Sequence, residues 1–170
     1  VAMKHPQFLV SAADVHDLSR RKPAEARELS QLIVTARQQG QAVLLDSGNY
    51  EKYWKRLSKW NVKSFHEVLG HAPATLAFCF DDLQLKGDQK TRAQQIIDAA
   101  LHDIEQAQFE SMLPIVHADN PDDLPEICGL VAKRMQPLML AVPERELGIG
   151  ILDRARNVVK IRKALDQESL

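Results

Sequence analysis

The chain has 170 residues, of which 45% are apolar and 26% are charged, and its formal net charge is -1 at pH 7. A chain of this size and composition can bury a hydrophobic core, which excludes a disordered or fibrous protein and predicts a single domain over residues 1–170. The acidic and basic residues are interspersed, so composition gives no sign of an extended basic surface for nucleic acid or a membrane. Composition does not exclude a local basic groove.

The two cysteines, Cys79 and Cys128, lie in separate apolar runs, and the sequence has no Cys-x-x-Cys pair or His/Cys cluster. We therefore expect two reduced, buried thiols and no metal site built from this chain. The sequence also has no basic-then-apolar leader and no run of ~18 apolar residues. These features predict a cytoplasmic protein with no membrane partner.

Short apolar runs alternate with amphipathic stretches along the first half of the chain. Phe8–Ala12 is predicted to form a strand. Pro23 is predicted to open a helix that ends at Gly40, because apolar residues recur at helical spacing between them. The second predicted strand is Val43–Asp46, and a polar turn separates it from a short predicted helix over Val62–Gly70.

The second half of the chain continues the alternation. The predicted strands cover Leu76–Phe80, Met112–Ala118 and Leu138–Val142, and the predicted helices cover Asp88–Phe109, Asp122–Arg134 and about Asp153–Leu165. Near-continuous apolar strands that alternate with helices are typical of an α/β protein with a parallel sheet covered by helices.

Two architectures fit these parallel βα repeats. One is a partial or complete (β/α)₈ TIM-like barrel, and the other is an open doubly wound parallel sheet. Length favours the open sheet, since a complete barrel needs ~200 residues or more. In both architectures ligands bind at the carboxyl ends of the strands, so the residues that follow each strand are the candidate site.

The second predicted strand ends in Asp46-Ser47-Gly48, with Tyr50 close behind. A carboxylate at a strand end can act as a general acid/base or accept hydrogen bonds from a ligand, and glycine allows close backbone approach or a positive φ. Tyr50 could stack on a planar ligand. The alternatives are that Asp46 and Ser47 only cap the turn and that Tyr50 packs under a loop.

Acidic and imidazole side chains follow the next two predicted strands. Asp81 and Asp82 could bind a metal ion or accept hydrogen bonds from the amide and amino groups of a heterocycle. The alternative is that they begin a turn as solvated acids. His117 could donate to a ligand carbonyl or transfer a proton, or it could simply be hydrogen-bonded to its surroundings.

Four stretches in chain order carry a resemblance to a known family. They are DSGNYE, FCFDD, MLPIVHAD and LAVPERELGIG, which begin at Asp46, Phe78, Met112 and Leu140. They resemble the Asp-Ser-Gly-Gly, Phe-Asp-Glu, Ile-Val-Gln-Gly-Gly and Leu-Ala-Val-Gly-Glu strand ends of tRNA-guanine transglycosylases. The resemblance covers most of the chain, from about Phe8 to Leu165.

Members of that family are (β/α)₈ barrels, of the queuine and archaeosine type, that exchange a base of a nucleic acid for a 7-deazaguanine. The resemblance implies that Asp46 is the catalytic carboxylate and that Asp81 accepts the N–H groups of a guanine-like edge. It places His117 where the family uses glutamine to hold the base carbonyl. The other implied pocket residues are Ser47, Gly48, Tyr50, Leu140, Ala141 and Val142.

The chain also departs from the family pattern. Asn49 replaces a glycine, His117 replaces the glutamine, and Pro143 replaces a further glycine. These replacements are closer to divergent members that modify DNA than to the tRNA enzymes. The nucleophilic aspartate of the family has no match, and neither have its zinc ligands. We therefore expect no cofactor from this chain, although zinc occurs in the family.

The resemblance implies an incomplete barrel, whose unpaired strand edges favour self-association or a second chain that completes it. The expected activity is transfer of a guanine or 7-deazaguanine base to nucleic acid, either tRNA or DNA, by a glycosyltransferase whose nucleophile lies outside this chain. Two alternatives stay open. One is a non-catalytic base-binding or assembly module, and the other is an unrelated α/β enzyme that acts on a phosphate or sugar.

Overall fold

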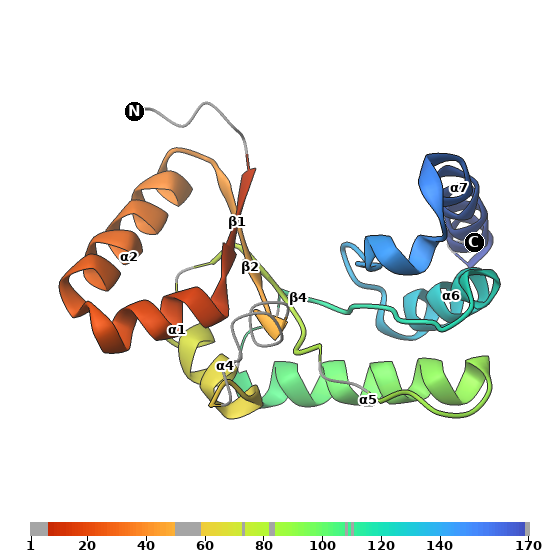
Figure 1. The fold of residues 1–170 in the computed structure, drawn as a ribbon, viewed down its shortest axis with the longest axis horizontal. Coiled ribbons are helices and arrows are strands. Elements are labelled where there is room, and N and C mark those ends of the chain that lie inside the picture. Colours follow the sequence, from red (N-terminus) through yellow and green to blue (C-terminus); the bar gives the residue numbers. More distant parts are fainter. Residues whose placement is uncertain are drawn as a thin grey trace. The chain divides into compact units, whose positions relative to one another are not determined.

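The computed structural model describes residues 7–49, 59–72, 74–81, 84–107, 109 and 111–168. Within these residues the chain forms a four-stranded parallel sheet and six α-helices, with strands and helices alternating along the sequence (Figure 1). The predicted α/β class with parallel βα repeats is therefore confirmed. The four strands are compatible with an open sheet and with part of a barrel.

The chain divides into two compact units. The first comprises Val1–Asp82 and His102–Met112, and the second comprises Leu83–Leu101 and Leu113–Leu170. The prediction of a single domain over the whole chain stays a prediction. Each unit has its own buried apolar residues, and each is described by itself.

The sheet has the order β1-β2-β3-β4, and its strands are β1 (Gln7–Ser11), β2 (Ala42–Asp46), β3 (Leu76–Phe78) and β4 (Met112–Leu113). In the parallel register Ser11 lies opposite Asp46, and Leu45 lies opposite Ala77. The carboxyl ends of β1, β2 and β3 therefore lie along one edge of the sheet, which we call the carboxyl edge.

Three helices of the first unit are α1 (Ala12–Arg21), α2 (Pro23–Gln38) and α4 (Val62–Leu69). Helix α1 contacts both α2 and α4, and α2 contacts β2 (Figure 1). On α2, Ile33 and Ala36 pack against Val43 of β2. These two residues belong to the apolar series whose helical spacing predicted this helix. Helix α4 begins after Asn61, whose side-chain oxygen accepts a hydrogen bond from the backbone N–H of Ser64.

Helix α1 was not predicted from the sequence. Its fully buried residues are Ala12 and Ala13, and most of the rest of the helix is polar. The apolar stripe is therefore too narrow to produce the helical periodicity on which the prediction depended. The helix is instead held by tertiary contacts with its neighbours.

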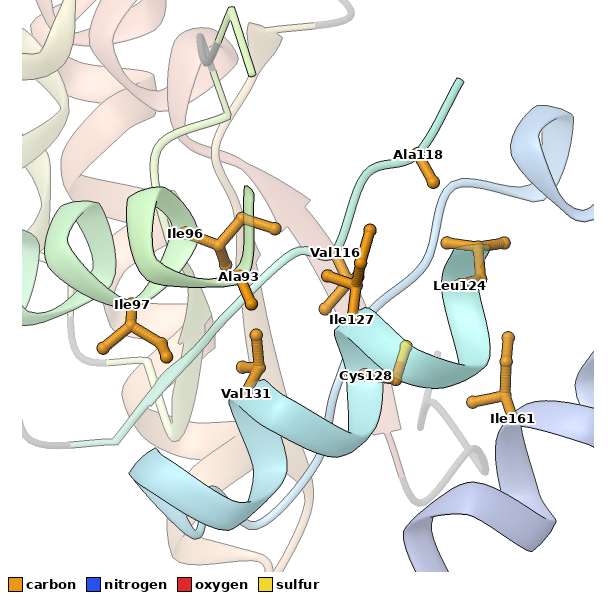
Figure 2. Close-up of a cluster of buried hydrophobic side chains, with 10 residues drawn as sticks. All are labelled: Ala93, Ile96, Ile97, Val116, Ala118, Leu124, Ile127, Cys128, Val131 and Ile161. Carbon is orange, nitrogen blue, oxygen red and sulfur yellow. The ribbon is translucent and has the colours of Figure 1, made fainter. Parts of the chain in front are cut away.

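The second unit is mainly helical. It holds most of α5 (Gln89–Ala107), all of α6 (Leu124–Met135) and α7 (Gly150–Glu168), and the 3₁₀ turns η1 (Pro121–Asp123) and η2 (Glu144–Leu147). Figure 2 shows its core, in which side chains of α5 and α6 meet an extended segment and α7. The core residues are Ala93, Ile96, Ile97, Val116, Ala118, Leu124, Ile127, Cys128, Val131 and Ile161.

The last two predicted strands are shorter than expected. The strand predicted over Met112–Ala118 is reduced to β4, and the one predicted over Leu138–Val142 is reduced to a single parallel bridge between Ile115 and Ala141. Pro114 lacks an N–H and so interrupts the ladder. Leu138 is 81% exposed, which shows that an apolar run alone does not ensure a covered strand.

Candidate functional site

The turn after β2 is fixed by its own residues. A side-chain oxygen of Asp46, Oδ2, accepts a hydrogen bond of 3.0 Å from the backbone N–H of Gly48. Gly48 has a φ of +77°, and a Cβ at this position would lie 2.5 Å from the Cβ of Ala13. Glycine is therefore required both for the backbone conformation and for the close approach to α1. Asp46 caps its own turn, which is one of the two roles considered for it.

Ser47 is 2% exposed, and its carbonyl oxygen accepts a hydrogen bond of 3.0 Å from Nε1 of Trp60. The indole of Trp60 lies edge-on to the ring of Phe65, and its centroid is 6.5 Å from that of Phe80. The turn therefore rests on an aromatic cluster, which holds it at the carboxyl edge.

Asp81 follows Phe80, whose backbone N–H donates a 2.6 Å hydrogen bond to Oδ2 of Asp103 on α5. The other oxygen of Asp103 lies 2.8 Å from Nε2 of His66 on α4. Asp103 is only 3% exposed. This buried carboxylate anchors the segment that carries Asp81, and sequence reasoning missed it. The sequence does hold a signal for it, because Asp103 lies one turn after Ala100 on the apolar face of the predicted helix.

Asp46 is the last residue of β2 and Asp81 comes three residues after the end of the neighbouring parallel strand β3, so both lie toward the carboxyl edge of the first unit. Both side chains are partly exposed. Parallel pairing thus places the ends of the two strands that lead to these acids side by side, at the edge where α/β proteins bind ligands.

Further polar groups lie at the same edge. Among the described residues, the hydroxyl of Ser11 and both amide atoms of Asn49 are buried and have no hydrogen-bond partner. Ser11 is the last residue of β1, and Asn49 follows the turn after β2. Buried polar groups in proteins are nearly always paired, so these atoms indicate a place for a polar partner. The asparagine amide can both donate and accept.

In the second unit, Nδ1 of His117 lies 2.8 Å from Oε1 of Glu146 on η2. The other oxygen of Glu146 accepts a hydrogen bond of 2.9 Å from the backbone N–H of Ala118. Burial works against ionisation of Glu146, but the hydrogen bonds from His117 and Ala118, with the charges of His117 and Arg145, hold its pKa below the ordinary value. The sequence did not predict the partner of Glu146, because nothing local connects it with His117.

The remaining predicted wall residues belong to the second unit. Leu140 and Val142 pack against its core, and both backbone polar groups of Ala141 take part in the bridge to the segment of Ile115. Tyr50 and Asp82 lie outside the described residues. The predicted site residues thus fall into two groups, with Asp46, Ser47, Gly48 and Asp81 in the first unit and His117, Leu140, Ala141 and Val142 in the second.

The first unit also contains a cavity of about 460 Å³ that the sequence did not predict. It lies among α1, α2 and α4, and its apolar lining includes Val15, Leu29 and Ile33. Arg27 and His71 are among its polar lining residues. Its volume is within the range of small-molecule sites.

The described ranges contain neither a metal-binding cluster nor a membrane-spanning helix. No three His, Cys, Asp or Glu side chains in these ranges are grouped so that they could hold a metal ion. None of the helices in that part of the chain has the length and apolar character needed to cross a membrane.

Comparison of the sequence with protein-family models gives no match, and comparison with curated proteins gives none either.

Proposed function

We propose that this chain is a transglycosylase-like cytoplasmic protein that binds guanine or a 7-deazaguanine base at the carboxyl edge of β1–β3. It takes part in base exchange on tRNA or DNA with a nucleophile that lies outside this chain, and self-association or a second chain completes the barrel. The resemblance of the four strand-end stretches supports this proposal, together with the polar groups gathered at the edge.

The observation that carries the proposal is the set of polar groups at the carboxyl edge. Asp46 and Asp81 follow adjacent strands, and the buried atoms of Ser11 and Asn49 have no partner among the described residues. Guanine presents two neighbouring N–H donors on one edge and a carbonyl acceptor beside them. A carboxylate accepts from the donors, and an asparagine amide can pair with either kind of group.

Asp46 and Asp81 have different roles in this proposal. The hydrogen bond from Gly48 orients the carboxylate of Asp46, which suits a group that exchanges a proton with the base. Asp81 reads the N–H edge of the base, and its segment is anchored by the bond from Phe80 to Asp103. A purine that lacks this pair of donors, such as adenine, is expected to bind more weakly.

A panel of thermal-shift measurements tests this proposal. Guanine and 7-deazaguanine are expected to raise the melting temperature, because ligands that bind only the folded state stabilise it. Adenine is the matched control and is expected to have little effect. Stabilisation by Mg²⁺ or by sugar phosphates, with none by guanine, would instead support an unrelated α/β enzyme.

A second candidate function is that of a non-catalytic binding module, and the cavity among α1, α2 and α4 favours it. Its apolar lining and Arg27 suit an amphipathic anion, for which anilinonaphthalene sulfonate is a convenient probe. Replacement Ala26→Trp should fill the cavity and abolish the fluorescence of the bound probe. Ala24→Trp, at an exposed position of α2, should leave the fluorescence unchanged. Equal fluorescence in both variants would remove this candidate.

A further inference from the structure

Helix α7 has apolar side chains on two sides. On one side α7 packs along α6, and Ile161 is buried in the core of the second unit (Figure 2). The other side carries five exposed residues, which we call the apolar face of α7: Ile151, Leu152, Ala155, Val158 and Val159. Their spacing of three, four and seven residues places them on one side of a helix. The four larger side chains are between 50% and 82% exposed, so the helix presents a continuous apolar stripe to solvent.

The first turns of α7 are fixed by hydrogen bonds to the chain before it. Nδ2 of Asn157 donates a 2.9 Å hydrogen bond to the carbonyl oxygen of Leu147, and Nε of Arg154 donates one of 3.2 Å to the carbonyl oxygen of Gly148. Asn157 is itself only 7% exposed. The apolar face is therefore held in place before a partner binds, which lowers the conformational cost of association.

The charges around the apolar face are largely neutralised within the chain. Helix α7 has five basic side chains, and four of them form ion pairs. The pairs are Arg154 with Glu144, Arg156 with Asp153, Lys160 with Asp122 and Arg162 with Asp166. A helix that binds an anionic membrane surface presents unpaired Lys and Arg beside its apolar side. Neutralised charges instead favour a protein partner, and they allow two identical faces to approach with little like-charge repulsion.

The apolar face is complementary to itself. Ile151 and Val158 are separated by two helical turns, Leu152 and Val159 likewise, and Ala155 lies in the middle of both pairs. When two copies of the helix run antiparallel about a two-fold axis at Ala155, Ile151 of each copy faces Val158 of the other, and Leu152 faces Val159. The small side chain of Ala155 lies where the helices cross and permits their close approach.

We propose that the apolar face of α7 is the interface of a homodimer in which the two copies of the helix pack antiparallel. Complete burial of an aliphatic side chain removes roughly 100 Å² from water, so the ten side chains of two faces bury on the order of 1,000 Å². This area is at the lower end for specific interfaces and predicts a dissociation constant in the micromolar range. The proposal does not depend on base binding, and it joins helices rather than strand edges.

Sedimentation equilibrium of the whole chain at about 1 to 100 µM measures the association. The wild type is expected to change from monomer to dimer over this range. Ala155→Glu places two like charges where the helices cross, so it should weaken the dimer at least about 100-fold. Glutamate is a good helix former, and Ala155 is exposed, so the fold is expected to persist.

Gln167→Glu is the matched control, because Gln167 is an exposed residue of the same helix that lies outside the apolar face. This variant carries the same change of charge and is expected to dimerise like the wild type. A dimer that Ala155→Glu leaves intact would overturn the proposal.

Disulfide cross-linking tests the antiparallel geometry, and it does so even if Ala155→Glu does not fold. The two copies of residue 155 lie against each other in the proposed dimer, so Ala155→Cys should form a disulfide-linked dimer on mild oxidation, whereas Gln167→Cys should not. The native thiols of Cys79 and Cys128 are buried and should not compete. Equal cross-linking of the two variants would contradict the proposed contact.

Two further results would overturn the proposal. One is a wild-type chain that stays monomeric at about 100 µM, because a micromolar dimer would be well populated at that concentration. The other is a monomer that binds vesicles of phosphatidylcholine and phosphatidylserine but loses this binding in Ala155→Glu, since the apolar face would then be occupied by a lipid surface.

Discussion

Gly48 and Ala13 lie in contact across the carboxyl edge: a methyl group on Gly48 would lie 2.5 Å from the Cβ of Ala13 and 2.6 Å from its backbone nitrogen. This contact joins the turn after β2 to the beginning of α1. It also fixes the position of Asp46, whose carboxylate is held by the backbone N–H of Gly48. The geometry of the candidate site thus depends on a glycine at this position.

Replacement of Gly48 by alanine should lower the free energy of unfolding by about 3 kcal/mol, because it adds a steric overlap to the cost of a positive φ. Gly40→Ala is the matched control. Gly40 has a φ of +79°, and a methyl group on it would meet nothing within 4 Å, so only the conformational cost of about 1 kcal/mol is expected. Urea denaturation followed by circular dichroism measures both values. An equal decrease in the free energy of unfolding for both variants would show that the turn can move away from α1, which would contradict the steric contact.

Removal of the buried carboxylate of Asp103 should destabilise the first unit. Asp103→Leu leaves the backbone N–H of Phe80 without its acceptor and His66 without its partner, at a cost of about 3 kcal/mol. Asp98→Leu, at an exposed position of the same helix, should change the free energy of unfolding by less than about 0.5 kcal/mol. Hydrogen exchange of the Phe80 amide gives a local measurement. Unchanged protection in Asp103→Leu would contradict the assigned contact.

The order of strands and helices could be predicted from the sequence because the strands are continuous apolar runs and most helices have a clear apolar stripe. Ile33 and Ala36 of α2 show this, since both are buried against β2 as their spacing requires. Helix α1 could not be predicted because its fully buried residues are two small ones, Ala12 and Ala13. The prediction of a strand around Leu138 was wrong because the exposure of this side chain depends on tertiary neighbours, which a local sequence pattern does not contain.

The candidate site was predictable only where its residues follow a strand directly. Asp46 and Asp81 could be placed at one edge because neighbouring parallel strands end together. The partners that position these and other site residues could not be found in this way. Asp103 and Glu146 reach Phe80 and His117 from distant parts of the sequence, and such contacts exist only once the chain has folded.

Both cysteine thiols should be unreactive in the folded protein. Burial raises the pKa of Cys79 to about 12, with a further contribution from the charge of Asp103, and burial alone raises that of Cys128 to about 12. Since the thiolate is the reactive form, neither residue should be modified by iodoacetamide at pH 8 within hours. Both should react rapidly in urea, as measured by mass spectrometry. Rapid modification of either thiol without urea would show that its surroundings open.

Titration calorimetry of guanine binding tests the central claim most directly. The wild-type chain is expected to bind guanine and 7-deazaguanine, and Asp81→Asn is expected to bind at least about tenfold more weakly because the amide cannot accept from both N–H groups of the base. Asp98→Asn is the control and should bind like the wild type. Absence of any heat with guanine, or equal affinity of Asp81→Asn and the wild type, would contradict a guanine site at the carboxyl edge.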